Sequence, residues 1–65
     1  MHIQLFIARR ERRLKQRELA KILNISSVAY SQKETGKSDF KLSEAITLAN
    51  HFKMSLDELF MEQGQ

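Results

Sequence analysis

The segment from Gln16 to Glu34 constrains the fold of this 65-residue chain more than any other part of it. Apolar residues fall on one helical face of its first half: Leu19, Ala20 and Leu23. Asn24 tolerates the left-handed conformation that ends a helix, and Ser26 is a favoured residue at the cap that begins one. The segment therefore predicts two short helices joined by a tight turn.

A helix pair with this connection is a helix-turn-helix unit, and the second helix of such a unit can enter the major groove of DNA. Similar corners also occur in proteins that never touch DNA. The pattern from residue 16 to residue 34 therefore leaves both alternatives open, and the rest of the chain has to decide between them.

Positive charge is concentrated beside this segment, although the net charge of the whole chain is only +3. Between residues 9 and 21 the basic side chains are Arg9, Arg10, Arg12, Arg13, Lys15, Arg17 and Lys21. Beyond Lys53 the charged residues are all acids. A charge run alone is compatible with a solvated helix face, but next to a helix pair it favours a polyanion such as nucleic acid.

Several other classes of function do not suit this composition. The sequence has no cysteine, and its two histidines, His2 and His51, lie far apart, so we expect no metal and no cofactor. No apolar run approaches the roughly 18 residues of a membrane span, so we expect no membrane contact and a reducing cytoplasm. Without a nucleophile–base pair or a glycine-rich phosphate loop, we do not expect an enzyme.

The whole pattern predicts one all-α domain over residues 1–65, with a core from about residue 5 to residue 60. The expected helices cover residues 4–13, 16–23, 27 to 33 or 34, 41 or 42 to 52, and 56–61. Ser55 and Glu58 form a capping box before the last helix. The expected inward side chains of the fourth helix are Leu42, Ala45, Ile46, Ala49 and Phe52.

Four pieces of the sequence occur in the order and spacing of a known family. They are Gln16-x-Glu18-Leu19-Ala20, Ile25-Ser26, Glu34-x-Gly36-Lys37, and the run from Met54 to Phe60. Together they resemble the Cro and phage-repressor type (XRE-like) helix-turn-helix family over residues 5 to 60. The resemblance implies a compact five-helix repressor-like domain, binding to a double-stranded DNA operator, and a two-fold homodimer.

The resemblance also implies roles for individual residues. The base-facing positions of the third helix are Ser27, Val28 and Gln32. The positions that meet the DNA backbone are Gln16, Arg17, Ser31, Lys33, Thr35, Lys37, Ser38 and Lys41. A glutamine at such a position pairs with adenine, and a valine packs on a thymine methyl group. Arg9 and Glu34 match a structural ion pair, while Leu56, Leu59 and Phe60 are candidates for the dimer interface.

The chain departs from the family pattern at a few positions. Lys15 stands where a capping serine or threonine is usual, and Lys33 replaces a large apolar residue. Phe40 stands in for a frequent proline, and is expected either to close the core or to lie in an exposed apolar patch. Arg10, Arg12 and Arg13 match no family role, so we expect them in solvent, where they attract DNA at long range.

The function implied is a sequence-specific transcription regulator of prokaryotic or phage origin that binds a palindromic operator as a homodimer. A Cro-like repressor or a small stand-alone controller fits best, with RNA polymerase as a further candidate partner and no small-molecule ligand expected. The alternative is a protein-interaction module of the same fold, such as an antitoxin-like partner binder without specific DNA binding.

Overall fold

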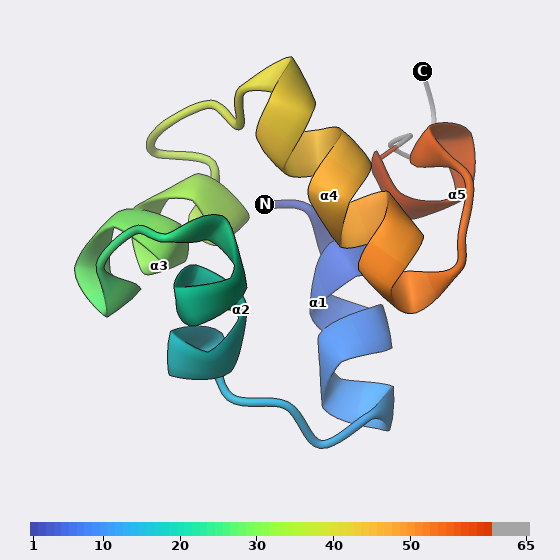
Figure 1. Ribbon diagram of the computed structural model, residues 1–65, viewed down its shortest axis with the longest axis horizontal. Coiled ribbons are helices and arrows are strands. Elements are labelled where there is room, and N and C mark those ends of the chain that lie inside the picture. Colours follow the sequence, from blue (N-terminus) through green and yellow to red (C-terminus); the bar gives the residue numbers. More distant parts are fainter. Residues whose placement is uncertain (61–65) are drawn as a thin grey trace.

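The computed structural model describes residues 1–60, and this part of the chain folds into five helices without a strand (Figure 1). The helices are α1 (Ile3–Glu11), α2 (Gln16–Leu23), α3 (Ser27–Thr35), α4 (Leu42–Phe52) and α5 (Leu56–Phe60). The predicted all-α class is therefore confirmed.

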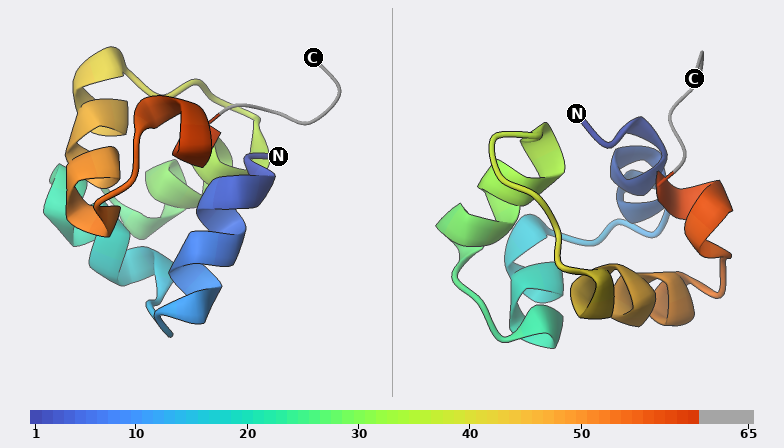
Figure 2. Two further views of the ribbon diagram at one scale, coloured as in Figure 1. Left: turned by 90° about the vertical axis from the view of Figure 1, so that its right-hand side faces the viewer. Right: turned by 90° about the horizontal axis from the view of Figure 1, so that it is seen from above.

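The helices surround one small core. α2 packs against α3, α1 packs against α5, and α4 contacts both α5 and α2 (Figure 2). The buried apolar side chains are Leu5, Ala8, Leu19, Ala20, Tyr30, Leu48, Ala49, Phe52 and Leu59. Because every helix contributes to this set, α3 is held in place by the core as well as by α2.

The connection between α2 and α3 forms as the sequence predicts. Asn24 ends α2 in the left-handed conformation, with φ 60° and ψ 43°. The Ser26 hydroxyl accepts a hydrogen bond of 3.0 Å from the backbone N–H of Ala29 and so caps the start of α3. Gly36 ends α3 at φ 92°, a conformation that glycine adopts without steric cost.

The predicted capping box of α5 is also confirmed. The Ser55 hydroxyl accepts from the Glu58 N–H at 3.0 Å, and the Glu58 carboxylate accepts from the Ser55 N–H at 2.8 Å. The helix is described to Phe60. Its predicted last residue, Met61, lies outside the described residues.

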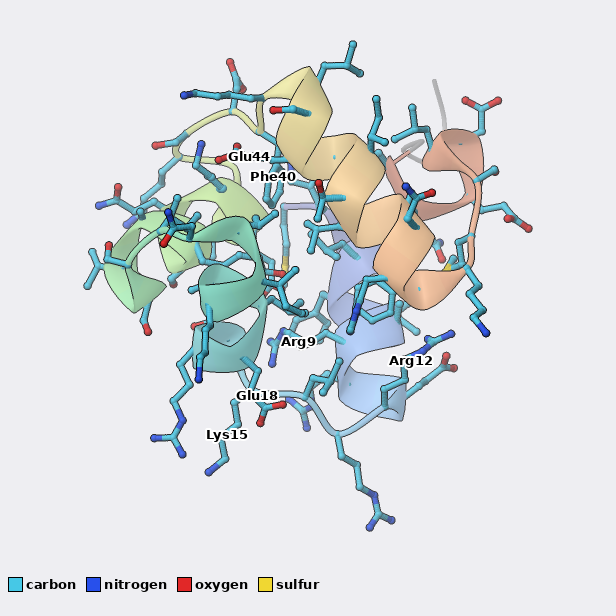
Figure 3. All side chains as sticks on the ribbon, in the orientation of Figure 1. Arg9, Arg12, Lys15, Glu18, Phe40 and Glu44 are labelled. Carbon is cyan, nitrogen blue, oxygen red and sulfur yellow. The ribbon has the colours of Figure 1, made fainter. Side chains whose placement is uncertain are left out.

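The prediction for the end of α1 was wrong. The helix ends at Glu11, and Arg13 adopts a left-handed φ of 54°. Nor does Arg12 extend freely into solvent: its Nη2 donates to the backbone oxygen of Phe52 at 3.1 Å, and its guanidinium lies 4.9 Å from the centre of the Phe52 ring (Figure 3). Arg12 thus binds an otherwise free carbonyl at the end of α4, where a positive charge is favourable.

The predicted inward face of α4 was only partly correct. Ala49 and Phe52 are buried, but Leu42 is 69% exposed and Ile46 is 42% exposed. Leu48, which was not in the predicted set, is fully buried as well. The predicted set and the buried set share Ala49 and Phe52. The contacts of α4 with α2 and α5 bury Leu48 and leave Leu42 and Ile46 largely in solvent.

Truncation of α4 side chains tests this assignment. We expect Leu48→Ala to lower the free energy of unfolding by about 2–5 kcal/mol because it leaves a cavity in the core. Leu42→Ala, on the same helix, should change it by less than about 0.5 kcal/mol because that side chain is mostly in solvent. Urea unfolding followed by circular dichroism measures both values, and equal losses would contradict the assigned face.

Candidate nucleic-acid interface

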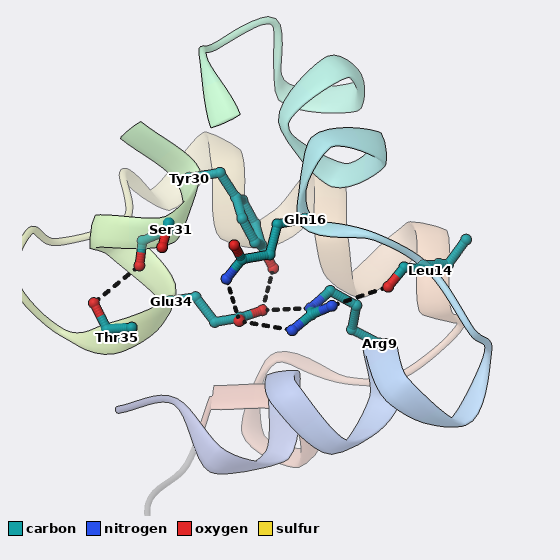
Figure 4. A network of polar contacts seen from close by, with 7 residues as sticks. All are labelled: Arg9, Leu14, Gln16, Tyr30, Ser31, Glu34 and Thr35. Atoms are coloured by element: carbon teal, nitrogen blue, oxygen red, sulfur yellow. Dashed lines mark hydrogen bonds and ion pairs between the residues drawn. The ribbon is translucent and has the colours of Figure 1, made fainter. Parts of the chain in front are cut away.

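The carboxylate of Glu34, in the last turn of α3, is the centre of a buried polar network (Figure 4). Arg9 of α1 donates to it from Nε at 2.9 Å and from Nη2 at 3.1 Å, which makes a two-pronged ion pair. The remaining amino group of Arg9, Nη1, donates to the backbone oxygen of Leu14 at 2.9 Å. The pair therefore ties α3 to α1 and to the loop that precedes α2.

Two further side chains donate to the same carboxylate. Gln16, the first residue of α2, donates from Nε2 to Glu34 Oε1 at 3.0 Å. The hydroxyl of Tyr30, one turn earlier in α3, donates to Oε2 at 2.8 Å. Glu34 is 1% exposed and Arg9 8% exposed, so four donors replace the water that the carboxylate loses.

These contacts decide the ionisation of Glu34. Burial by itself would raise the pKa of the carboxyl group, but hydrogen bonds from Arg9, Gln16 and Tyr30 and the charge of Arg9 outweigh it, and the pKa is lowered. Burial, together with the neighbouring carboxylate, raises the pKa of the Tyr30 hydroxyl. The network thus holds a charged glutamate and a neutral tyrosine at neutral pH.

The opposite face of α3 is open to solvent. Ser27, Val28 and Gln32 are exposed, and the apolar side chain of Val28 is 68% exposed. Tyr30 and Glu34 point the other way, into the network and the core. Val28 and Gln32 therefore lie on the outward side of a helix whose inward side is fixed. Ser27 is seven residues before Glu34, on nearly the same helical line, and is exposed because it lies in the first turn of α3.

The loop after α3 is tied to that helix. The backbone N–H groups of Lys37 and Ser38 both donate to the Gln32 oxygen, at 2.8 and 3.1 Å. The Thr35 hydroxyl donates to the Ser31 oxygen at 2.9 Å. The side chains of Thr35, Lys37 and Lys41 are exposed, as is that of Arg17 on α2, whereas Ser31 and Ser38 are half-buried.

Lys33, predicted to meet the DNA backbone, makes polar contacts within the protein. Its ammonium group donates to Glu44 Oε1 at 3.0 Å and to the Asp39 backbone oxygen at 3.0 Å. Only 14% of its side chain is exposed. Lys33 therefore fastens α3 to the start of α4, and its charge is already neutralised within the protein, which argues against a phosphate contact.

Phe40 closes the core next to the contacts of Lys33 with Glu44 and Asp39. Its ring packs against His2, Tyr30 and Phe60 with centroid distances of 5.3, 6.0 and 5.4 Å. Lys33 Nζ lies 6.0 Å from the centre of the same ring. Of the two alternatives for Phe40, the structure selects the packed one.

The predicted dimer residues differ in what they offer to a partner. Leu59 is fully buried in the core, so it cannot contribute to an interface without unfolding of α5. Phe60 is half-buried against Phe40 and His2. Leu56, at 37% exposure, is the member of the set that most clearly faces solvent.

Sequence reasoning missed the hydroxyl of Tyr30 and the capping role of Arg12. The first had a detectable signal, because residues 30 and 34 are four apart and lie on one helical face. The second had none, because Arg12 and Phe52 are far apart in sequence and meet only in the folded chain.

The described residues contain no group of three or more histidine, cysteine or acidic side chains placed to hold a metal ion. Among residues 1–60 no helix is long and apolar enough to cross a membrane. A helix-turn-helix family model matches residues 5–59 of the chain. No curated protein and no solved structure gives a significant match.

The Glu34 network predicts a specific acid sensitivity. We expect Glu34→Gln to lower the free energy of unfolding at pH 7 by about 3–5 kcal/mol, because Arg9 is left as an unpaired buried charge. The contribution of a carboxyl group with a lowered pKa is fully present above its unfolded pKa of about 4.3 and is lost as the pH falls through the folded value. The difference between wild type and variant should therefore shrink below about pH 4.

Urea unfolding between pH 7 and pH 3 measures this difference, with Glu11→Gln, an exposed site on α1, as the control. A difference that stays constant down to pH 3 would contradict the lowered pKa.

Tyr30→Phe removes a single donor from the network and should lower the free energy of unfolding by about 1.5–3 kcal/mol. That variant provides a folded comparison if Glu34→Gln proves too unstable.

Proposed function

The chain belongs to the Cro/C1-type (XRE) helix-turn-helix family, and from this premise we propose that it is a homodimeric repressor that recognises a palindromic DNA operator. Membership of the family makes it a DNA-binding transcription regulator in general terms. The particular operator geometry, the dimer and the direction of regulation are the proposal.

The observation that carries the proposal is the division of α3 into two faces. Its inner face is fixed by Glu34 and Tyr30, its outer face presents Val28 and Gln32 to solvent, and Ser27 is exposed in its first turn. A helix that enters the major groove needs both properties, because base contacts are selective only when the side chains are rigidly positioned.

The outward side chains suit direct readout of base edges. The Gln32 amide offers a donor and an acceptor that match N7 and N6 of adenine. Val28 supplies an apolar surface for a thymine methyl group, and the Ser27 hydroxyl can either donate or accept. All three side chains are exposed to solvent, so DNA can reach them.

Groups around α3 suit the phosphate backbone. Arg17, Lys37 and Lys41 are exposed cations, and Ser31 and Ser38 add hydroxyl groups, whereas the proton of the Thr35 hydroxyl is already donated to the Ser31 backbone oxygen. Gln16 keeps one amide hydrogen beyond the one it gives to Glu34, and it lies at the N-terminus of α2, where an anion is favoured. Such contacts supply affinity that falls with salt and set the position of α3.

A dimer follows from the small reach of one helix. A single recognition helix reads only a few base pairs, too few to define a site among the competing sites of a genome. Two copies on a palindrome, with half-sites about 34–36 Å apart, double the readout. Leu56 and Phe60 are the proposed interface residues, because Leu59 is committed to the core.

A protein-interaction module is the second candidate. It is favoured by Leu42 and Ile46, which lie one turn apart on α4 and expose apolar side chains.

One experiment separates the two candidates. It selects bound sequences from a random pool of duplex DNA at about 150 mM salt and then measures the stoichiometry of the bound complex. A palindrome bound by two chains supports the repressor, whereas the absence of any enriched sequence favours the module.

Two alanine variants test the roles within the interface. Gln32→Ala should lose about 1–3 kcal/mol of discrimination at one base pair in each half-site. Lys37→Ala should weaken binding to all sequences alike. It should also reduce the slope of log K against log salt concentration by about one. Fluorescence anisotropy on matched and single-mismatch duplexes measures both effects. A uniform loss for Gln32→Ala would refute its readout role.

A further inference from the structure

The connection between α3 and α4, residues 36–41, carries two of the exposed cations proposed to meet DNA phosphates, Lys37 and Lys41. A long side chain loses rotational freedom when it binds, so its contribution to affinity depends on how well the backbone beneath it is fixed. An ion pair of 3.0 Å between Lys33 in α3 and Glu44 in α4 spans this connection. The two helices at its ends are therefore joined directly.

The same ion pair also binds the backbone of the connection. The ammonium group of Lys33 donates to the Asp39 oxygen at 3.0 Å as well as to Glu44 Oε1. Glu44 Oε1 in turn accepts from the backbone N–H of Lys41 at 2.8 Å. One carboxylate oxygen thus receives both the lysine of α3 and the residue that precedes α4.

Burial makes the pair a fixed contact. Its side chains are 14% and 11% exposed, and Glu44 lies with Phe40 near the start of α4 (Figure 3). Burial alone would raise the pKa of the Glu44 carboxyl group, but the hydrogen bonds and charges of Lys41 and Lys33 outweigh it, and the pKa is lowered. Because the charges are mostly shielded from solvent, salt at the concentrations used for DNA binding screens them only weakly.

The connection is tied to the outward side of α3 as well. The backbone N–H groups of Lys37 and Ser38 donate to the Gln32 oxygen at 2.8 and 3.1 Å. Gln32 is the residue proposed to read a base, and Lys33 follows it in the chain. A displacement of the connection would therefore move the phosphate contacts relative to the base contact.

Stability alone does not account for this ion pair. Removing two charges from water costs about as much as their attraction contributes, and apolar side chains of similar volume are often equally stabilising. A buried ion pair with further hydrogen bonds differs in that it sets one position for the backbone groups it binds. The Asp39 oxygen and the Lys41 N–H are such groups.

We propose that Lys33 and Glu44 are positioning residues for DNA binding. As an ion pair they hold residues 36–41 so that Lys37 and Lys41 meet the phosphates without first having to be ordered. The inference rests on the proposed DNA-binding function and gives Lys33 an indirect role in place of the direct phosphate contact expected from the sequence.

Glu44→Gln separates the two roles, because it removes the charge but keeps an oxygen that can accept from the Lys41 N–H. If Lys33 acts indirectly, affinity for the selected duplex at about 150 mM salt should fall about 2- to 10-fold, the effect of immobilising one long side chain. If Lys33 acts directly, its release should raise the affinity and steepen the slope of log K against log salt concentration by about 0.9.

Glu58→Gln is the matched control. Glu58 carries the same charge and also accepts from a backbone N–H at the start of a helix, at 2.8 Å. It lies on α5, however, and forms no ion pair with another described residue. Its substitution should therefore cause no loss of DNA affinity.

The double variant Lys33→Met/Glu44→Gln removes the pair without leaving an unpaired charge. We expect a melting temperature close to that of the wild type. Affinity should fall by the same factor as in Glu44→Gln, because the two residues act as a unit, and the salt slope should stay unchanged. Hydrogen exchange measured by NMR on the free variant should be faster at the backbone N–H groups of Lys37 and Ser38.

The outcomes separate this proposal from the function on which it rests. Weaker binding of both variants at an unchanged slope, with no loss for Glu58→Gln, supports the positioning role. Tighter binding of Glu44→Gln, a slope lowered by about 0.9 in the double variant, unchanged binding in both, or an equal loss in Glu58→Gln overturns it. In each of these cases an operator selected by the wild type leaves the proposed function intact.

If the wild type selects no sequence, the proposed function fails. The same comparison on a random duplex then still decides the role of Lys33 and Glu44, because phosphate contacts do not depend on the base sequence.

Discussion

The charge of Glu34 is the constraint on which the rest of the structure depends. Its carboxylate sits inside a small protein, where an unpaired charge would not be tolerated. Arg9 neutralises that charge, and the neutral side chains of Gln16 and Tyr30 donate further hydrogen bonds. Arg9 brings α1, Gln16 brings the start of α2, and Tyr30 fixes the side of α3 that faces inward. One buried carboxylate thereby links α3 to α1 and to the start of α2.

A second clamp acts at the other side of α3. Lys33 binds Glu44 and the backbone of Asp39, while the loop N–H groups of Lys37 and Ser38 bind the Gln32 oxygen. α3 is consequently held along its length by polar contacts as well as by the apolar core. A domain with so small a core gains orientational precision from such contacts that apolar packing alone does not give.

The sequence predicted the helices well where local chemistry decides. Asn24, Ser26, Gly36 and the Ser55–Glu58 box act through neighbouring backbone atoms, and their effects can be read from spacing. It failed where the outcome depends on distant partners. Leu48 rather than Leu42 is buried because of how α4 meets α2 and α5, and Lys33 points inward because Glu44 lies opposite it. The base-facing residues were proposed from resemblance, and the structure shows only that they are exposed.

The separation of the two faces of α3 has an evolutionary consequence. Ser27, Val28 and Gln32 contribute nothing to the buried network, so their exchange leaves the scaffold intact. Substitutions at these exposed positions should therefore cost little stability, and under the proposed function they would change the DNA sequence that is recognised. The buried network and the core can therefore stay constant while the exposed residues of α3 change. Such an arrangement suits regulators that diverge after gene duplication.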